Sequence, residues 1–155
     1  MIKRGDLYRV LQGINLAGSL TGIKFSYSMS KNKNLIMAEL KSAEESLQQS
    51  PEMLAFEKDR MELVNEYGTR DKKGNLVVEN NQYAIEKMDE FNEKVEALKK
   101  VHKEAIDENQ KKIDEYNEFM KEEIDMPFHM ISMQDIPENI SVDVMDQIMP
   151  LVSEK

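Results

Sequence analysis

The chain has 155 residues, a net charge of −9, and 40% hydrophobic and 33% charged residues, which fits one soluble domain with a modest core over residues 1–155. The absence of cysteine excludes disulfides, thiolate zinc sites, iron–sulfur clusters and cysteine nucleophiles. No apolar run approaches the roughly 18 residues of a membrane span, and polar residues interrupt the first 22. We therefore expect a cytoplasmic protein with no membrane partner.

Charge divides the chain into a basic start and an acidic remainder. Residues 1–35 contain six Lys or Arg against Asp6 alone, while the rest contains 15 basic and 29 acidic residues. Nucleic-acid affinity comes largely from clustered Lys and Arg that neutralise phosphates, and a net acidic surface disfavours it. We therefore expect no direct nucleic-acid partner.

Helical spacing of apolar residues, with its start and stop signals, predicts the first three elements. A short amphipathic helix is expected over 6–17 with Asp6 as its cap, and a longer one over 23–48 after the glycine-containing turn. Ser50, Pro51 and Glu52 form a strong helix start, so a third helix is expected over 51–67, ended by Gly68.

A long helix dominates the second half of the prediction. Residues 83–124 contain neither Gly nor Pro, and an unbroken helix there would be about 63 Å long, against the roughly 30 Å diameter of a compact domain this size. It must project, pair with another helix or break. A break or hairpin would cost the least stability in residues 102–112, where apolar residues are sparsest. A final short helix is expected over 141–150, capped by Ser141.

Two short strands complete the prediction, at about 76–79 and 129–133, and residues 76–78 are expected to pair with 130–133. The fold class is therefore mainly α with a minor β element: a helical domain with one long, projecting or hairpin-folded helix and a small two-stranded sheet.

No motif predicts catalysis. Gly13 to Ser19 has the glycine spacing of a phosphate loop but lacks its lysine and follows a helix, so we interpret it as a helix end. The two histidines, His102 and His129, have no partners at metal-ligand or triad spacing and are interpreted as surface residues. We expect no enzyme, no cofactor and no metal site.

The acidic residues between Glu104 and Asp125 outnumber lysines by nine to three. Such a strip could bind divalent cations, mimic nucleic acid, dock a basic partner or simply be a solvated helix face.

The sequence also resembles a family. In chain order it contains Leu7-Tyr8-Arg9-Val10-Leu11, Lys24-Phe25-Ser26-Tyr27, Lys31-Asn32-Lys33-Asn34, the stretch from Glu66 to Asn75 (EYGTRDKKGN) and Asp89-Glu90-Phe91-Asn92. In these it resembles small proteins of tailed bacteriophages and prophages grouped as domain of unknown function 1617. It departs from them by an extra acidic helical length around residues 102–121. The resemblance implies a phage origin and no catalytic motif.

We therefore predict a non-enzymatic phage protein that acts by protein–protein binding through its long acidic helix, as a virion, assembly or accessory component. It would then be located in the cytoplasm of the bacterial host or in the virion. In a coiled-coil pairing with itself or another protein, the seam would be Met88, Phe91, Val95 and Leu98. The alternative is an acidic inhibitor of a host nucleic-acid-handling or defence enzyme. In that case Glu115, Glu118 and Glu122 would face a basic channel of the target.

Overall fold

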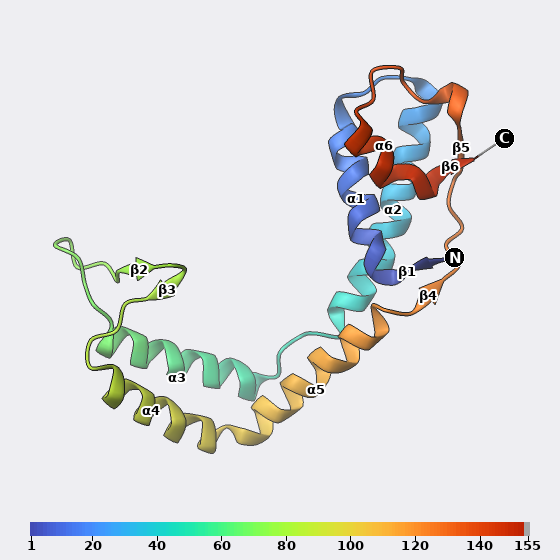
Figure 1. Cartoon of the computed structure of the whole chain (residues 1–155). Helices are drawn as coiled ribbons and strands as arrows, with labels where there is room; N and C mark the ends of the chain where they lie inside the picture. The colour runs from blue at the N-terminus through green and yellow to red at the C-terminus, as the bar shows by residue number, and fades with distance from the viewer. Residues whose placement is uncertain (154–155) are drawn as a thin grey trace. The chain divides into compact units, whose positions relative to one another are not determined.

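The computed structural model describes residues 1–153 and is mainly helical with short strands, which confirms the predicted fold class (Figure 1). The α-helices are α1 (Leu7–Leu16), α2 (Ile23–Glu45), α3 (Pro51–Tyr67), α4 (Met88–Val101), α5 (Lys103–Phe119) and α6 (Val142–Ile148). The strands pair as β1 (Ile2–Lys3) with β4 (Glu123–Ile124), β2 (Val78–Glu79) with β3 (Gln82–Tyr83), and β5 (Ile131–Ser132) with β6 (Val152–Ser153). Within the described chain, no helix is both long and apolar enough to cross a membrane.

The chain forms two compact units where we expected one domain. Unit 1 combines residues 1–47 with the segment from 114 onward, and unit 2 consists of residues 48–113.

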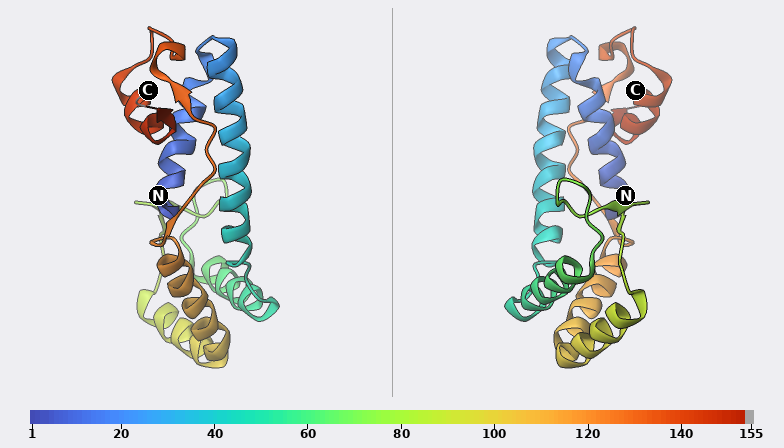
Figure 2. Two further views of the ribbon diagram at one scale, coloured as in Figure 1. Left: turned by 90° about the vertical axis from the view of Figure 1, so that its right-hand side faces the viewer. Right: turned by 90° about the vertical axis from the view of Figure 1, so that its left-hand side faces the viewer.

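Unit 1 is built around α1, α2 and α6, whose side-by-side ribbons are visible in Figure 1 and Figure 2. The predicted apolar stripe of α1 is confirmed, since Leu7, Val10 and Ile14 are all buried. The rest of the core comes from the 3-10 turn after α1, from α2 and from the last part of the chain, namely Ala17, Phe25, Met29, Ile36, Leu40, Ile131, Val144, Ile148 and Leu151.

Helices α1 and α6 approach each other closely at Gly13. A Cβ atom added at Gly13 would lie 2.6 Å from the Cβ of Gln147 and 3.0 Å from a methyl carbon of Ile148. Since real Cβ contacts are longer than this, the glycine lets the backbone of α1 approach α6 directly.

A buried asparagine on α2 holds the segment that follows β4. Asn32 is fully buried; its Nδ2 donates to the carbonyl of His129 at 2.9 Å, and its Oδ1 accepts from the His129 amide at 2.8 Å. The side chain thus pairs with the backbone as a neighbouring strand would, and no buried polar group of this contact is left unsatisfied.

Unit 2 is a pair of helices, α3 and α4, with a small β structure at the connection between them. Thr69 donates its amide to the carbonyl of Ala84 at 2.8 Å, and Val77 donates to the carbonyl of Thr69 at 2.9 Å. Asn80 and Asn81 both have positive φ, 50° and 61°, which is the geometry of a two-residue turn between β2 and β3.

Several predicted boundaries are confirmed. The α3 helix begins and ends as expected, and the Ser50 side chain accepts from the Met53 amide at 3.1 Å. Ser141 caps α6 in the same way. The expected Asp6 cap is wrong, because this residue lies in a 3-10 turn and its side chain makes no capping hydrogen bond.

The segment expected as one helix over 83–124 forms two helices, and the break expected within 102–112 is confirmed at His102, whereas both ends of the segment are not helical. Residue 83 lies in β3, Lys87 has a left-handed φ of 50°, and the α-helical backbone is interrupted at His102, where φ is −101° and ψ is 20°. The interruption falls at the start of the apolar-poor stretch 102–112. After α5 ends at Phe119, the chain passes into β4 instead of continuing as a helix.

The expected pairing of 76–78 with 130–133 is wrong. Strand β2 pairs with β3 across the short asparagine turn, whereas β5 pairs in parallel with β6. A hairpin closes only a few residues of chain, so it forms at far lower entropic cost than a pairing across fifty residues.

Candidate functional site

The predicted coiled-coil seam lies along one face of α4. Phe91, Val95 and Leu98 are half-buried, while Met88 is half-exposed. The Phe91 ring meets the Tyr67 ring of α3 edge-on, with centroids 6.1 Å apart. Part of this face is therefore engaged within unit 2.

The three predicted acidic residues are exposed and do not form one cluster. Glu115 and Glu118 lie on α5, whereas Glu122 follows the end of that helix. Glu118 pairs with Lys121 at 2.7 Å, and Glu122 accepts from Arg4 at 3.1 Å. Glu122 thus contributes to the internal structure of unit 1.

Arg4 is a residue that sequence reasoning missed. It is buried, its Nε donates to Glu39 at 2.8 Å, one terminal nitrogen donates to the Phe119 carbonyl at 2.7 Å, and its guanidinium lies 3.5 Å from the Phe119 ring centroid. Burial lowers the pKa of Arg4, but the hydrogen bonds and charges of its two carboxylate partners outweigh it and raise the pKa overall. A cation at the carbonyl end of α5 also interacts favourably with the helix dipole. The basic start of the chain was the only signal of this site.

His102 is half-buried, contrary to its interpretation as a surface residue. Its Nε2 lies 3.1 Å from the Asp59 carboxylate and its ring lies 5.7 Å from that of Phe56, both on α3. A hollow of about 520 Å³ adjoins it and is lined by Glu52 and residues 100–105. These contacts hold the interrupted point between α4 and α5 against α3.

Unit 2 buries little apolar surface for its size. Among residues 1–153, its 66 residues supply four of the buried hydrophobic side chains (Met53, Phe56, Val64 and Ala105), against thirteen from unit 1. Its exposed large hydrophobic residues are Leu54, Met61, Val78, Tyr83, Met88, Val101 and Ile113. The helices α3 and α4, with only residues 103–113 of α5 in the same unit, enclose a small core, because an apolar helix face needs a second apolar surface to cover it.

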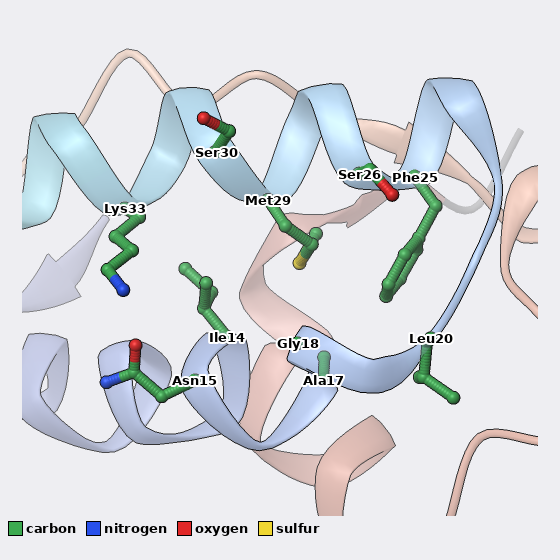
Figure 3. A pocket seen from close by; sticks show the side chains of 10 residues that line it. All are labelled: Ile14, Asn15, Ala17, Gly18, Leu20, Phe25, Ser26, Met29, Ser30 and Lys33. Atoms are coloured by element: carbon green, nitrogen blue, oxygen red, sulfur yellow. The ribbon is translucent and has the colours of Figure 1, made fainter.

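A cavity of about 250 Å³ lies in unit 1 between the end of α1 and the first turns of α2. We call it the Lys33 cavity; its lining residues are Ile14, Asn15, Ala17, Gly18, Leu20, Phe25, Ser26, Met29, Ser30 and Lys33. Figure 3 shows the side chains of Lys33 and Asn15 turned toward each other at one end, Ile14 and Met29 in the middle, and the Phe25 ring at the other end.

A second hollow on the same helix pair, of about 390 Å³, is lined by Tyr8, Leu11, Met37, Lys41 and Glu44 among others. At its edge the Tyr8 hydroxyl donates to Glu44 at 2.6 Å. Burial and this hydrogen bond raise the pKa of Tyr8.

No group of three or more potential metal ligands occurs among the side chains that the structure describes. Comparison with family models, curated proteins and solved structures yields no match to this chain.

Proposed function

We propose that this is a non-enzymatic phage protein that acts by binding another protein, as a virion, assembly or accessory component, and that unit 2 carries the binding surface. The phage assignment rests on the family resemblance. The binding assignment rests on the small buried core of unit 2 and the apolar residues left on its surface.

The surface proposed is at the end of unit 2 where α3 begins and α4 ends. Leu54 has 54% and Val101 79% of its side chain exposed, and each lies one or two residues from the contacting Phe56 and His102 rings. Single exposed apolar side chains are ordinary on protein surfaces. These two adjoin the small buried core of unit 2, so they continue its apolar surface to the outside of the unit. A partner that covers them would supply the second apolar layer that the helix pair lacks.

Charge does not oppose association through unit 2. Residues 48–113 contain 12 Lys or Arg and 15 Asp or Glu, so the unit carries a net charge of only −3 of the chain's −9. A second copy of the chain and a foreign protein both satisfy this chemistry.

The first experiment measures solution mass by light scattering over a concentration series of the full chain. We expect concentration-dependent association that Val101→Glu abolishes. The matched control is Val142→Glu, because Val142 is the same residue type, is 83% exposed and lies on α6 of unit 1.

Hydrogen exchange extends the test to a foreign partner. If the chain stays monomeric, amides of α3 and α4 are expected to exchange faster than those of α1 and α2, because a thin core opens locally at low cost. A monomer in which both units are equally protected would contradict the proposal, since unit 2 would then be complete by itself.

A further inference from the structure

We propose that the Lys33 cavity binds an aliphatic carboxylate of medium chain length, with the ligand carboxylate at Lys33 and its chain running along Ile14 and Met29 toward Phe25. This site lies in unit 1 and does not depend on the protein-binding proposal.

Among the residues that the structure describes, the ammonium group of Lys33 has no counter-charge. Lys33 is half-buried, yet it makes no hydrogen bond or ion pair with any residue in 1–153, and the residues lining the cavity include no Asp or Glu. Its neighbours one turn away on α2 are Met29, Ser30, Ile36 and Met37, which are uncharged. A partly desolvated cation gains more from an anionic partner than an exposed one does.

A carboxylate fits the polar end better than a phosphate does. In Figure 3 the side-chain oxygen of Asn15 faces Lys33 and its NH2 group points away. A half-turn of the terminal amide group presents the NH2 group to the ligand as a second hydrogen-bond donor. One ammonium and one amide can satisfy the two oxygens of a carboxylate. Sites for a phosphate dianion usually supply more donors, from arginines or from several backbone amides.

Beyond Lys33 and Asn15 the cavity is lined mainly by apolar side chains, with the hydroxyl-bearing Ser26 and Ser30 on α2 among them. Lys33 and Phe25 are eight residues apart on α2, which is about 12 Å along the helix axis. Ile14, Met29 and Phe25 are all buried and supply the walls between these ends. The volume of about 250 Å³ lies below the roughly 300–1,000 Å³ of sites for drug-sized ligands, so a medium-length chain fits and a long lipid chain does not.

The test is a titration of the full-length protein with octanoate, followed by the methyl NMR signals of Ile14, Ala17 and Met29. We expect saturable shifts at these methyls, and binding weakened about tenfold or more in Lys33→Met, because a charge-assisted hydrogen bond is lost. The control Lys31→Met removes a lysine of the same helix whose ammonium lies over the Tyr27 ring, 5.6 Å from its centroid, and does not line the cavity. Its affinity for octanoate is expected to equal that of the wild type.

Octanol distinguishes the contribution of the ligand's charge from that of its apolar chain. It offers the same chain without the charge, and we expect it to bind at least about tenfold more weakly than octanoate. Folding of Lys33→Met is checked by circular dichroism, and we expect it unchanged because the Lys33 side chain has no hydrogen-bond or ion-pair partner within residues 1–153. Absence of saturable shifts with millimolar octanoate, or equal affinity of Lys33→Met and wild type, would overturn the proposal.

Discussion

Asn32→Asp tests how the buried asparagine holds unit 1 together. The new side chain has nearly the same shape and keeps the oxygen that accepts from the His129 amide. It loses the donor to the His129 carbonyl, and when ionised it places a negative charge against that carbonyl in a fully buried position. When protonated, its O–H can donate to the carbonyl and restore both hydrogen bonds.

The magnitude follows from these two contacts. Leaving a buried partner unsatisfied costs about 1–3 kcal/mol, and burying the charge adds to it, so we expect Asn32→Asp to lower the free energy of unfolding by about 3 kcal/mol at pH 7. Burial raises the pKa of the new carboxyl above the ~3.9 of an unfolded aspartate. The folded state therefore favours the protonated form. The loss of unfolding free energy caused by Asn32→Asp grows as pH rises above the unfolded-state pKa of ~3.9.

The assay is urea unfolding at pH 7 and pH 5. Unfolding is monitored by hydrogen exchange of the unit 1 amides, so that unit 2 does not contribute to the signal. The penalty is expected to shrink by about 1–2 kcal/mol at pH 5. Asn34→Asp is the matched control, because Asn34 is exposed on the same helix, and its effect should stay within about 0.5 kcal/mol of wild type at both pH values. Equal effects of the two substitutions at pH 7, or a penalty of Asn32→Asp that is independent of pH, would refute the reasoning.

Three further predictions concern single contacts. Gly13→Ala forces α1 away from α6 and should lower the free energy of unfolding by about 1–2 kcal/mol after its gain in helix propensity. In contrast, Gly18→Ala, with no atom within 4 Å, should be neutral or slightly stabilising by urea unfolding. Arg4→Met leaves two carboxylates and a helix-end carbonyl without their donor and should cost about 2–4 kcal/mol in thermal or urea unfolding. Arg9→Met, which breaks the exposed pair with Asp146, should cost less than about 1 kcal/mol. The pKa of Asp71 is lowered below 3.8, because the side chain accepts backbone amides of Asn75 and Lys73 that favour its charged form. The contribution of Asp71 to loop order should be present above pH 3.8 and be lost as pH falls through its folded pKa, as followed by exchange of the Asn75 amide; persistence of protection well below pH 2 would contradict this.

Local signals predicted much of the fold. The stripe of Leu7, Val10 and Ile14 identified the buried face of α1, and Ser50 with Pro51 located the start of α3, because helical spacing and capping act within a few residues. The Asn80–Asn81 turn was also a local signal, and it was overlooked in favour of a long-range strand pairing.

The remaining contacts join residues far apart in the chain. Arg4 meets Phe119 across 115 residues, and Asn32 meets His129 across 97. No local sequence pattern around Arg4 or Asn32 indicates its distant partner, so these contacts can be identified only in the folded structure. The unpaired state of Lys33 is equally invisible in the sequence, since it depends on which acidic residues do not reach the cavity.

The division of unit 1 between two sequence segments has a consequence during synthesis. Residues 1–47 leave the ribosome with the apolar face of α1 already made, but Ile131, Ile148 and Leu151 follow about 90 residues or more after Leu40. At roughly 5–20 residues per second, that face waits several seconds for its partners, while the whole of unit 2 emerges in between. Unit 2 is therefore free to fold first. The nascent segment 1–47, whose apolar face is still uncovered, is the part of the chain that a chaperone would bind.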